Sequence, residues 1–195
     1  MIKYLKKSKS EFEKNVLKEH RITTKGIEVG HIFYFGDKYS KPLNAAVDFQ
    51  EGKKDFVKMG SYGIGVSRLV GAIIEAKYND KDEIMKWPFA VSPYDIAIIP
   101  QISKNETLNI ERANSVYNFL KEKNIDVILD DTEENFSSKI KKFNLIGIPY
   151  QILIGKKSEG DLLEFKEIGK EAQYLPLNQI VDLIIKQKSK IWYLH

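Results

Sequence analysis

The sequence predicts an α/β protein built from two successive domains. Segments rich in β-branched and aromatic residues alternate with segments whose apolar residues recur at helical spacing. A short strand precedes a glycine-rich segment, residues 60–65, and a helix follows directly. The pattern changes at Ser92-Pro93, where proline disfavours a continuing helix and continuous apolar strands begin. We therefore expect domains over residues 1–92 and 93–195.

The composition excludes several classes of protein. The 195 residues suffice for one or two domains, and hydrophobic and charged fractions of 43% and 30% are ordinary for a globular protein. There is no run of about 18 apolar residues and no secretory signal, so we expect no association with a membrane. Cysteine is absent, which excludes disulfides and thiolate metal sites and is compatible with the cytoplasmic location that we expect.

The net charge of +4 is concentrated near the N-terminus. Residues 1–25 contain eight lysines and arginines against three acidic residues, a net charge of +5, so the rest of the chain carries −1. A basic segment of this kind can attract a phosphate backbone. The alternative is that these lysines form a solvated end with no partner.

The first domain is expected to begin with a polar helix and to continue with short strands. The expected elements are a helix over residues 1–20, strands over 27–35, 44–50 and 56–59, a glycine-rich turn over 60–65 and a helix over 66–78. Gly30 marks a bulge or a close approach of two backbones within the first strand. The second helix should bury one face, on which five apolar residues recur at intervals of three and four: Val66, Leu69, Val70, Ile73 and Ile74.

The second domain is expected to alternate strands and helices. We expect strands over residues 94–100, 126–129, 149–155 and 162–168, and helices over 105–123, 134–146 and 177–188. This alternation is typical of an α/β unit in which most strands pair in parallel.

The glycine-rich segment and the arginine that follows it suggest an anion site. Gly60, Gly63 and Gly65 allow a tight bend and a close approach to a ligand, and the next helix points its N-terminus at this bend. Arg68 lies in the first turn of that helix, where a guanidinium can pair with phosphate or lie on a purine ring. The spacing is neither the dinucleotide fingerprint nor a P-loop. The glycines could therefore serve only to let the helix pack on the sheet.

Three longer segments resemble bacterial-type prolyl-tRNA synthetases. These are GIEVGHIFYFGDKYSKPLNAAV, MGSYGIGVSRLVGAIIEA and WPFAVSPYDIAIIP. Within the second, GIGVSRLVGA resembles motif 3 of class II aminoacyl-tRNA synthetases, and the later LIGIPYQILIG resembles the anticodon-binding domain of the same enzymes. The resemblance covers about residues 26–185. It implies that residues 1–92 are the C-terminal part of an antiparallel-sheet catalytic domain, and residues 93–195 an anticodon-binding domain with a mixed sheet.

The resemblance also implies an activity, that of a proline–tRNA ligase. Proline would be activated with ATP and Mg²⁺ to prolyl-adenylate and then transferred to proline tRNA, while the second domain recognises the anticodon. The partners implied are proline, proline tRNA and, in the full-length enzyme, a second subunit. Such chemistry depends mostly on positioning and on neutralising charge.

The resemblance assigns site residues to the first domain. Arg68 matches the catalytic motif 3 arginine that contacts ATP, and Gly63 and Gly65 would line the ATP site. The proline-binding candidates are Glu28, Gly30, His31 and Ser61. Ser61 stands where many bacterial relatives have a cysteine. His31 could instead be a core histidine satisfied by the backbone, and Glu28 could form a structural salt bridge.

The sequence departs from the family in two places. Nothing in residues 1–25 resembles motif 1 or motif 2, so we expect this chain alone not to form prolyl-adenylate. After the second strand of the anticodon-binding domain, Thr132 and Asn135 replace two arginines of the usual loop.

Lysines that follow this loop could restore its positive charge. On helical spacing Lys139 and Lys142 share a face, with Lys141 nearby, and the expected tRNA-binding residues are Asp131, Lys139 and Lys142. The alternative is a solvated lysine face. At the level of the whole chain, the alternatives are a non-catalytic paralogue or fragment that binds tRNA, and a generic α/β nucleotide-binding protein.

Overall fold

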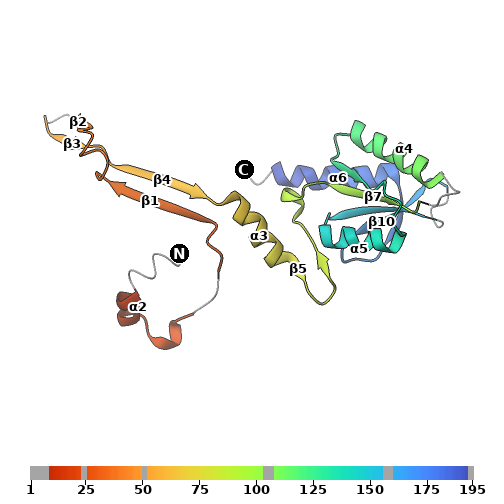
Figure 1. Cartoon of the computed structure of the whole chain (residues 1–195), viewed down its shortest axis with the longest axis horizontal. Helices are drawn as coiled ribbons and strands as arrows, with labels where there is room; N and C mark the ends of the chain where they lie inside the picture. The colour runs from red at the N-terminus through yellow and green to blue at the C-terminus, as the bar shows by residue number, and fades with distance from the viewer. Residues whose placement is uncertain (1–8, 23–25, 50–51, 103–107, 156–159, 193–195) are drawn as a thin grey trace. The chain divides into compact units, whose positions relative to one another are not determined.

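The chain divides into two units in the computed structural model, which describes residues 9–22, 26–49, 52–102, 108–155 and 160–192. The two units span residues 1–72 and 73–195, and the division falls within one helix. Figure 1 shows their elements.

A short lead-in begins the described part of the first unit. It holds the helix α2 (Lys9–Asn15) and the 3₁₀ turn η1 (Lys18–His20). Arg21 Nε donates to the carbonyl oxygen of Val16 at 2.7 Å, so the residue that follows the 3₁₀ turn is bonded to the residue that follows α2. The polar helix expected over residues 1–20 is therefore present over residues 9–15, and residues 1–8 lie outside the described part.

Two antiparallel hairpins follow. Strand β1 (Gly30–Gly36) pairs with β4 (Met59–Ile64), and β2 (Ala46–Asp48) pairs with β3 (Lys54–Phe56). The prediction of a glycine-rich turn over residues 60–65 is wrong, because most of these residues form strand β4. Gly65 alone separates β4 from the following helix α3 (Val66–Lys77).

The glycines of β4 and β1 serve close packing rather than a turn. A Cβ on Gly30 would lie 3.2 Å from the carbonyl oxygen of Gly63, which confirms the close backbone approach expected at Gly30. Gly60, Gly63 and Gly65 do not have positive φ angles, whereas Gly36 at the end of β1 does (φ 56°). Three glycines close together in sequence are thus compatible with an extended strand.

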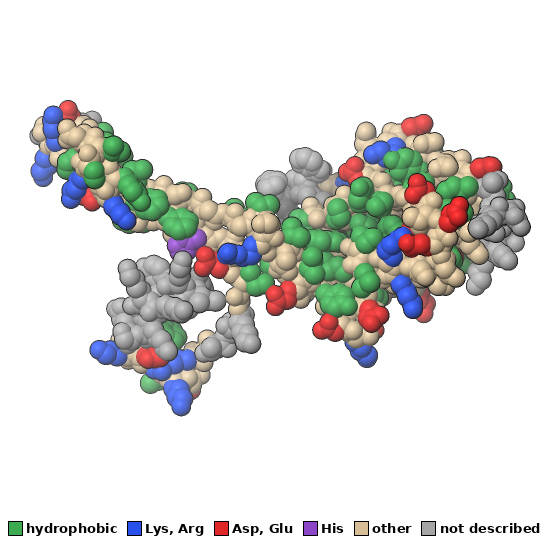
Figure 2. Space-filling model, in the orientation of Figure 1, with side chains coloured by type: hydrophobic (Ala, Val, Ile, Leu, Met, Phe, Trp, Pro, Cys, Tyr) green, Lys and Arg blue, Asp and Glu red, His purple; other side chains and the backbone are tan. Residues whose placement is uncertain are grey.

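Helix α3 forms where the apolar spacing predicted it, but its apolar face is not buried. The exposed fractions of Val66 and Ile74 are 73% and 42%, and no described residue of this helix is fully buried. The paired strands β1 and β4 also expose apolar side chains, since the exposed fractions of Ile32 and Tyr62 are 71% and 82%. Figure 2 shows hydrophobic side chains along the hairpin surface. The predicted burial of the helix face is therefore wrong for this chain, because the described residues supply no layer to cover it.

The second unit contains a five-stranded mixed sheet. Its strands are β7 (Ile96–Pro100), β8 (Val127–Leu129), β9 (Tyr150–Ile154), β10 (Leu162–Glu167) and β11 (Gln173–Pro176), in the order β11-β10-β9-β7-β8. Strand β7 pairs in parallel with β8 and β9, while β10 pairs antiparallel with β9 and β11. The mixed sheet implied by the family resemblance is confirmed. The residue pattern alone suggested mostly parallel pairing and did not predict β11.

Three helices cover the two faces of this sheet. Helices α4 (Leu108–Glu122) and α6 (Leu177–Trp192) lie on one face, and α5 (Phe136–Ile146) lies on the other. Alternate residues of β7 explain this, since Ile96 and Ile98 join the core under α4 and α6, and Ala97 and Ile99 pack with Phe143 of α5. All five residues of β7 are buried, as expected for a central strand.

A connector joins α3 to the sheet. It contains the short pair β5 (Tyr78–Asn79) and β6 (Ile84–Met85) and the 3₁₀ turn η2 (Phe89–Val91). The backbone N–H of Trp87 donates to the carbonyl oxygen of Gly147 and its indole N–H to that of Ile146, which fixes the connector to the end of α5. In the described part of the chain, no helix is both long and apolar enough to cross a bilayer.

Candidate functional site

The Arg68 side chain lies at the start of α3 and is exposed. Its Nη1 donates to the carbonyl oxygen of Glu28 at 2.8 Å, which ties the helix to the segment before β1. A guanidinium has five N–H donors, so this bond leaves others directed at solvent or a ligand. Arg68 therefore lies beside the β1–β4 strand pair, and its expected contact with ATP stays a prediction.

Gly65 brings the backbone close to Arg68. The N–H of Gly65 donates to the carbonyl oxygen of Val29 at 2.9 Å, and its carbonyl accepts the N–H of Leu69 at 2.8 Å in the first turn of α3. A Cβ at Gly65 would lie 3.3 Å from the Cβ of Arg68. A larger residue would therefore push against the aliphatic base of the Arg68 side chain.

The hairpin brings two of the proline-binding candidates onto one face. His31 lies opposite Gly63, and Ser61 lies opposite Phe33, two residues further along β1. Because side chains alternate along a strand, His31, Phe33 and Ser61 share one face. The rings of His31 and Phe33 meet edge to face with centroids 4.4 Å apart, and a Cβ on Gly63 would lie 3.4 Å from Phe33 Cε2.

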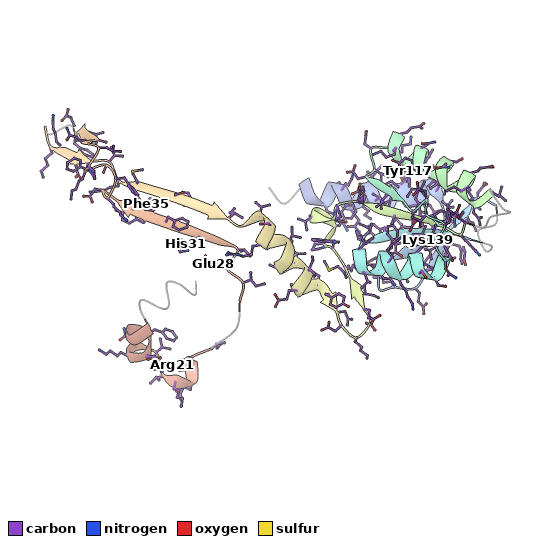
Figure 3. All side chains as sticks on the ribbon, viewed as in Figure 1. Arg21, Glu28, His31, Phe35, Tyr117 and Lys139 are labelled. Atoms are coloured by element: carbon purple, nitrogen blue, oxygen red, sulfur yellow. The ribbon has the colours of Figure 1, made fainter. Side chains whose placement is uncertain are left out.

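The other two proline-binding candidates lie apart from this face. Gly30 is paired with Ile64, so its position belongs to the opposite face of β1. Glu28 precedes the strand with an exposed side chain, and its carbonyl oxygen holds Arg68. Figure 3 shows Glu28 and His31 at the same end of the hairpin.

The loop between β8 and α5 carries the candidate tRNA residues. Asn135, which occupies an arginine position of the family loop, is the N-cap of α5 and accepts the N–H of Ser137 at 2.9 Å. Asparagine is a strongly preferred N-cap residue, so Asn135 stabilises the start of α5. Asp131 is exposed in the same loop.

Lys139 is fully buried (0% exposed), on the face of α5 that meets the sheet. Its Nζ donates to the carbonyl oxygens of Pro100 and Asp130, both at 3.2 Å, and lies 3.6 Å from Asp130 Oδ1. Its position on α5 is labelled in Figure 3. The sequence suggested a surface lysine that contacts RNA, but the structure does not present the ammonium of Lys139 to solvent.

Lys142 lies one turn further along α5 and is 35% exposed. Its Nζ contacts Asp130 Oδ2 at 2.9 Å and Glu134 Oε2 at 3.0 Å, and these two carboxylates raise its pKa. Lys139 and Lys142 therefore share a face, as their spacing predicted. Both side chains point toward Asp130, but Lys139 is buried there while Lys142 stays partly exposed.

Asp130 is a buried charged residue of this loop that the sequence analysis did not single out. Burial alone would raise the pKa of this carboxyl, but hydrogen bonds from Thr132 and Lys142 and the charge of Lys139 outweigh it and hold the pKa below its usual value. Thr132 donates to Oδ1 from both its N–H (3.0 Å) and its hydroxyl (2.5 Å). The signal was its position directly after β8, because the carboxyl ends of strands in open α/β sheets gather ligand-binding groups.

Comparison with known proteins places these sites in context. Residues 95–187 match the family described as "Anticodon binding domain". A proline–tRNA ligase of Pelagibacter ubique (strain HTCC1062) is 68% identical over 183 residues, which cover 94% of this chain and 41% of the relative. One of Wolbachia sp. subsp. Brugia malayi (strain TRS) is 50% identical over 152 residues, covering 77% of this chain and 35% of the relative.

A more distant relative agrees with these two. The proline–tRNA ligase of Buchnera aphidicola subsp. Baizongia pistaciae (strain Bp) is 41% identical over 168 residues, covering 85% of this chain and 29% of the relative. The chain spans about two fifths or less of the length of these relatives. From its matches and its fold, the chain belongs to the bacterial-type prolyl-tRNA synthetase family, as a C-terminal segment that includes the anticodon-binding domain.

Proposed function

We propose that this chain is the C-terminal part of a proline–tRNA ligase. Residues 1–92 would supply the end of the catalytic domain, and residues 93–195 would bind the anticodon of proline tRNA. The observation that carries the proposal is 68% identity to a proline–tRNA ligase over 94% of the chain, a match too long to reflect one shared motif. The reaction is ATP-dependent activation of proline followed by transfer to proline tRNA.

In the first step, a carboxylate oxygen of proline attacks the α-phosphorus of ATP and pyrophosphate leaves. In the second, a hydroxyl of the terminal adenosine of tRNA attacks the carbonyl carbon and AMP leaves. Arg68 would bind ATP through its remaining N–H donors. Gly63 and Gly65, which have no side chains, would let ATP come close to the backbone. His31 and Ser61, which share a face, would contact proline together with Glu28 and Gly30. Arg68 would act by neutralising phosphate charge that grows in the transition state.

The residues fit ATP better than they fit Mg²⁺. Arg68 is exposed beside an open backbone, as a nucleotide contact requires. Among the described residues, no group of three or more histidine and acidic side chains could hold a metal ion. Mg²⁺ would be held mainly by the phosphates of ATP, since Mg²⁺ commonly uses only one or two protein carboxylates.

The second domain would contact tRNA through the β8–α5 loop. Asp131 and Lys142 are the candidates for direct contact with tRNA. Lys139 is buried and would act on tRNA binding only through the residues that it contacts. The full-length protein would work as a cytoplasmic homodimer, as its family resemblance implies.

A non-catalytic tRNA-binding protein is the second candidate. The observation that favours it is the loop itself, where Asn135 caps a helix instead of offering a positive charge to RNA. Such a protein would have no use for an ATP-contacting Arg68, and for this reason we favour the ligase.

A chimaera tests the choice. The segment of the Pelagibacter relative that matches this chain is replaced by the 195-residue chain, and proline-dependent exchange of pyrophosphate into ATP is measured. We expect exchange and tRNA charging by the chimaera and none by the chain alone, because a transition-state contact from the upstream part is missing.

The experiment needs two controls, one for full activity and one for background activity. The intact Pelagibacter protein sets the scale, and its upstream part alone shows the background. A folded chimaera that binds proline tRNA but exchanges no pyrophosphate would favour the non-catalytic protein, and exchange by the chain alone would refute the expectation that it is inactive.

A further inference from the structure

The carboxyl ends of β7 and β8 form a topological switch point. Strand β7 leads into α4 on one face of the sheet, and β8 leads into α5 on the other face. In open α/β sheets, ligands bind in the crevice outside neighbouring strands whose connections diverge in this way. Pro100 is the last residue of β7, and Asp130 directly follows β8.

Lys139 lies buried against the carboxyl ends of these two strands. Its ammonium donates to the carbonyl oxygens of Pro100 and Asp130, so one side chain joins the ends of both strands to α5. The carboxylate of Asp130 is only 2% exposed and has this ammonium 3.6 Å away. A carboxylate buried without a cation would be costly, so the buried ammonium of Lys139 serves as one counter-ion of Asp130.

Lys142 is a second cation on the same carboxylate, but its surroundings differ. It lies between buried Asp130 and exposed Glu134, and it is itself partly exposed. Glu134 has 52% of its side chain exposed, so water can solvate it when the lysine leaves. Two lysines thus serve one buried carboxylate, and the outer one can be released without leaving that carboxylate alone.

We propose that Lys139 is a positioning residue for RNA binding: it keeps Asp130 neutralised, and so allows Lys142 to leave its carboxylate partners for an RNA phosphate. This inference rests on the proposed function, that the second domain binds tRNA. It explains why a loop that lacks the two family arginines can still bind a phosphate backbone.

The alternative is that Lys139 has a purely structural role. In that case its loss would weaken the domain and lower tRNA affinity, but the contribution of Lys142 would stay the same. The two ideas therefore differ in the coupling between the two lysines, which a double-mutant cycle measures.

The test uses the 195-residue chain and a proline tRNA transcript. The affinity is measured by filter binding between about 50 and 200 mM salt, and the slope of log K against log[salt] is taken for each variant. We expect Lys142→Met to lower this slope by about 0.7, the value for one lost phosphate contact on a single strand. In the Lys139→Met background, Lys142→Met should change the slope little, because Lys142 must stay on Asp130.

A third background provides the rescue. In Lys139→Met with Asp130→Asn, the buried charge is gone, so Lys142 is free again and Lys142→Met should once more lower the slope by about 0.7. If Lys139→Met does not fold, which circular dichroism would show, this double variant carries the comparison. Lys141→Met is the matched control, and its effect should be equal in all three backgrounds.

Each outcome decides the matter. Equal effects of Lys142→Met in the wild-type and Lys139→Met backgrounds would overturn the proposal, as would no effect in the wild type or no return of the effect in the double variant. A wild-type chain that does not retain proline tRNA even at low salt would instead overturn the proposed function itself.

Discussion

At the residue scale, two basic side chains that look alike in sequence have opposite environments. Arg68 is exposed at a helix start and donates to the backbone carbonyl oxygen of Glu28. Lys139 is completely buried and serves two carbonyls and a carboxylate. An exposed guanidinium is available to a ligand, whereas a buried ammonium acts on its neighbours.

We predict that Arg68→Ala in the chimaera lowers proline-dependent pyrophosphate exchange by about 100-fold or more, the usual loss when a transition-state donor is removed. Arg68→Lys keeps the positive charge but loses the planar, forked guanidinium. Its exchange activity should therefore lie between those of the unmodified chimaera and Arg68→Ala. Arg112→Ala is the control, since Arg112 also donates to backbone carbonyls from a helix but lies in the other unit. Full activity in folded Arg68→Ala would show that this arginine only supports the backbone at Glu28.

At the scale of single elements, the end of α5 is fixed by its backbone. Gly147 follows the helix with φ of 85°, a left-handed conformation, and its N–H donates to the carbonyl oxygen of Phe143 at 2.9 Å. A Cβ there would lie 2.6 Å from Met85 Cγ and 2.9 Å from the carbonyl oxygen of Met85. The helix end and the β6 strand therefore pack too closely for any other residue.

Gly147→Ala and Gly169→Ala should separate backbone strain from packing. Both glycines have positive φ, but a Cβ on Gly169 would meet no atom within 4 Å. We expect Gly169→Ala to lower the free energy of unfolding by about 1 kcal/mol. Gly147→Ala should lower the free energy of unfolding by this amount and by about a further 1–3 kcal/mol, the cost of the clash with Met85. Equal losses in urea denaturation would contradict the close packing at Met85.

At the scale of the whole molecule, the two units differ in how much they bury. The sheet of the second unit is covered on both faces, and β7 is buried throughout. The β1–β4 pair of the first unit has only two strands, and apolar side chains such as Tyr62 remain exposed. Two strands alone are marginally stable in water. The relatives are more than twice as long, so we infer that the rest of such a protein covers this surface.

Hydrogen exchange should report this difference. In the isolated chain, we expect amides of β7 and β9 to exchange slowly and those of β1 and β4 to exchange much faster, because local opening of a two-stranded pair costs little. In the chimaera, β1 and β4 should become protected while β7 and β9 stay the same. Equal protection of β1 and β7 in the isolated chain would refute the inference.

The sequence by itself determined most of the elements and the family. Local residue patterns placed helices α3, α4, α5 and α6 and strands β7, β8, β9 and β10, because periodicity is a local property, but they did not predict β11. The glycine-rich segment pointed to Arg68, while the resemblance supplied the role expected of this arginine and the mixed sheet. Local pattern failed at residues 60–65, since glycines permit both turns and extended strands, and only pairing with β1 decides between them.

Only the tertiary structure decided what the charged residues do. The spacing of Lys139 and Lys142 showed that they share a face, but not that the face is turned inward onto Asp130. Burial depends on which element packs against a helix, and this involves residues far apart in sequence, such as Pro100 and Lys139. For the same reason, the apolar face of α3 could be recognised from the sequence, while its exposure in this chain could not.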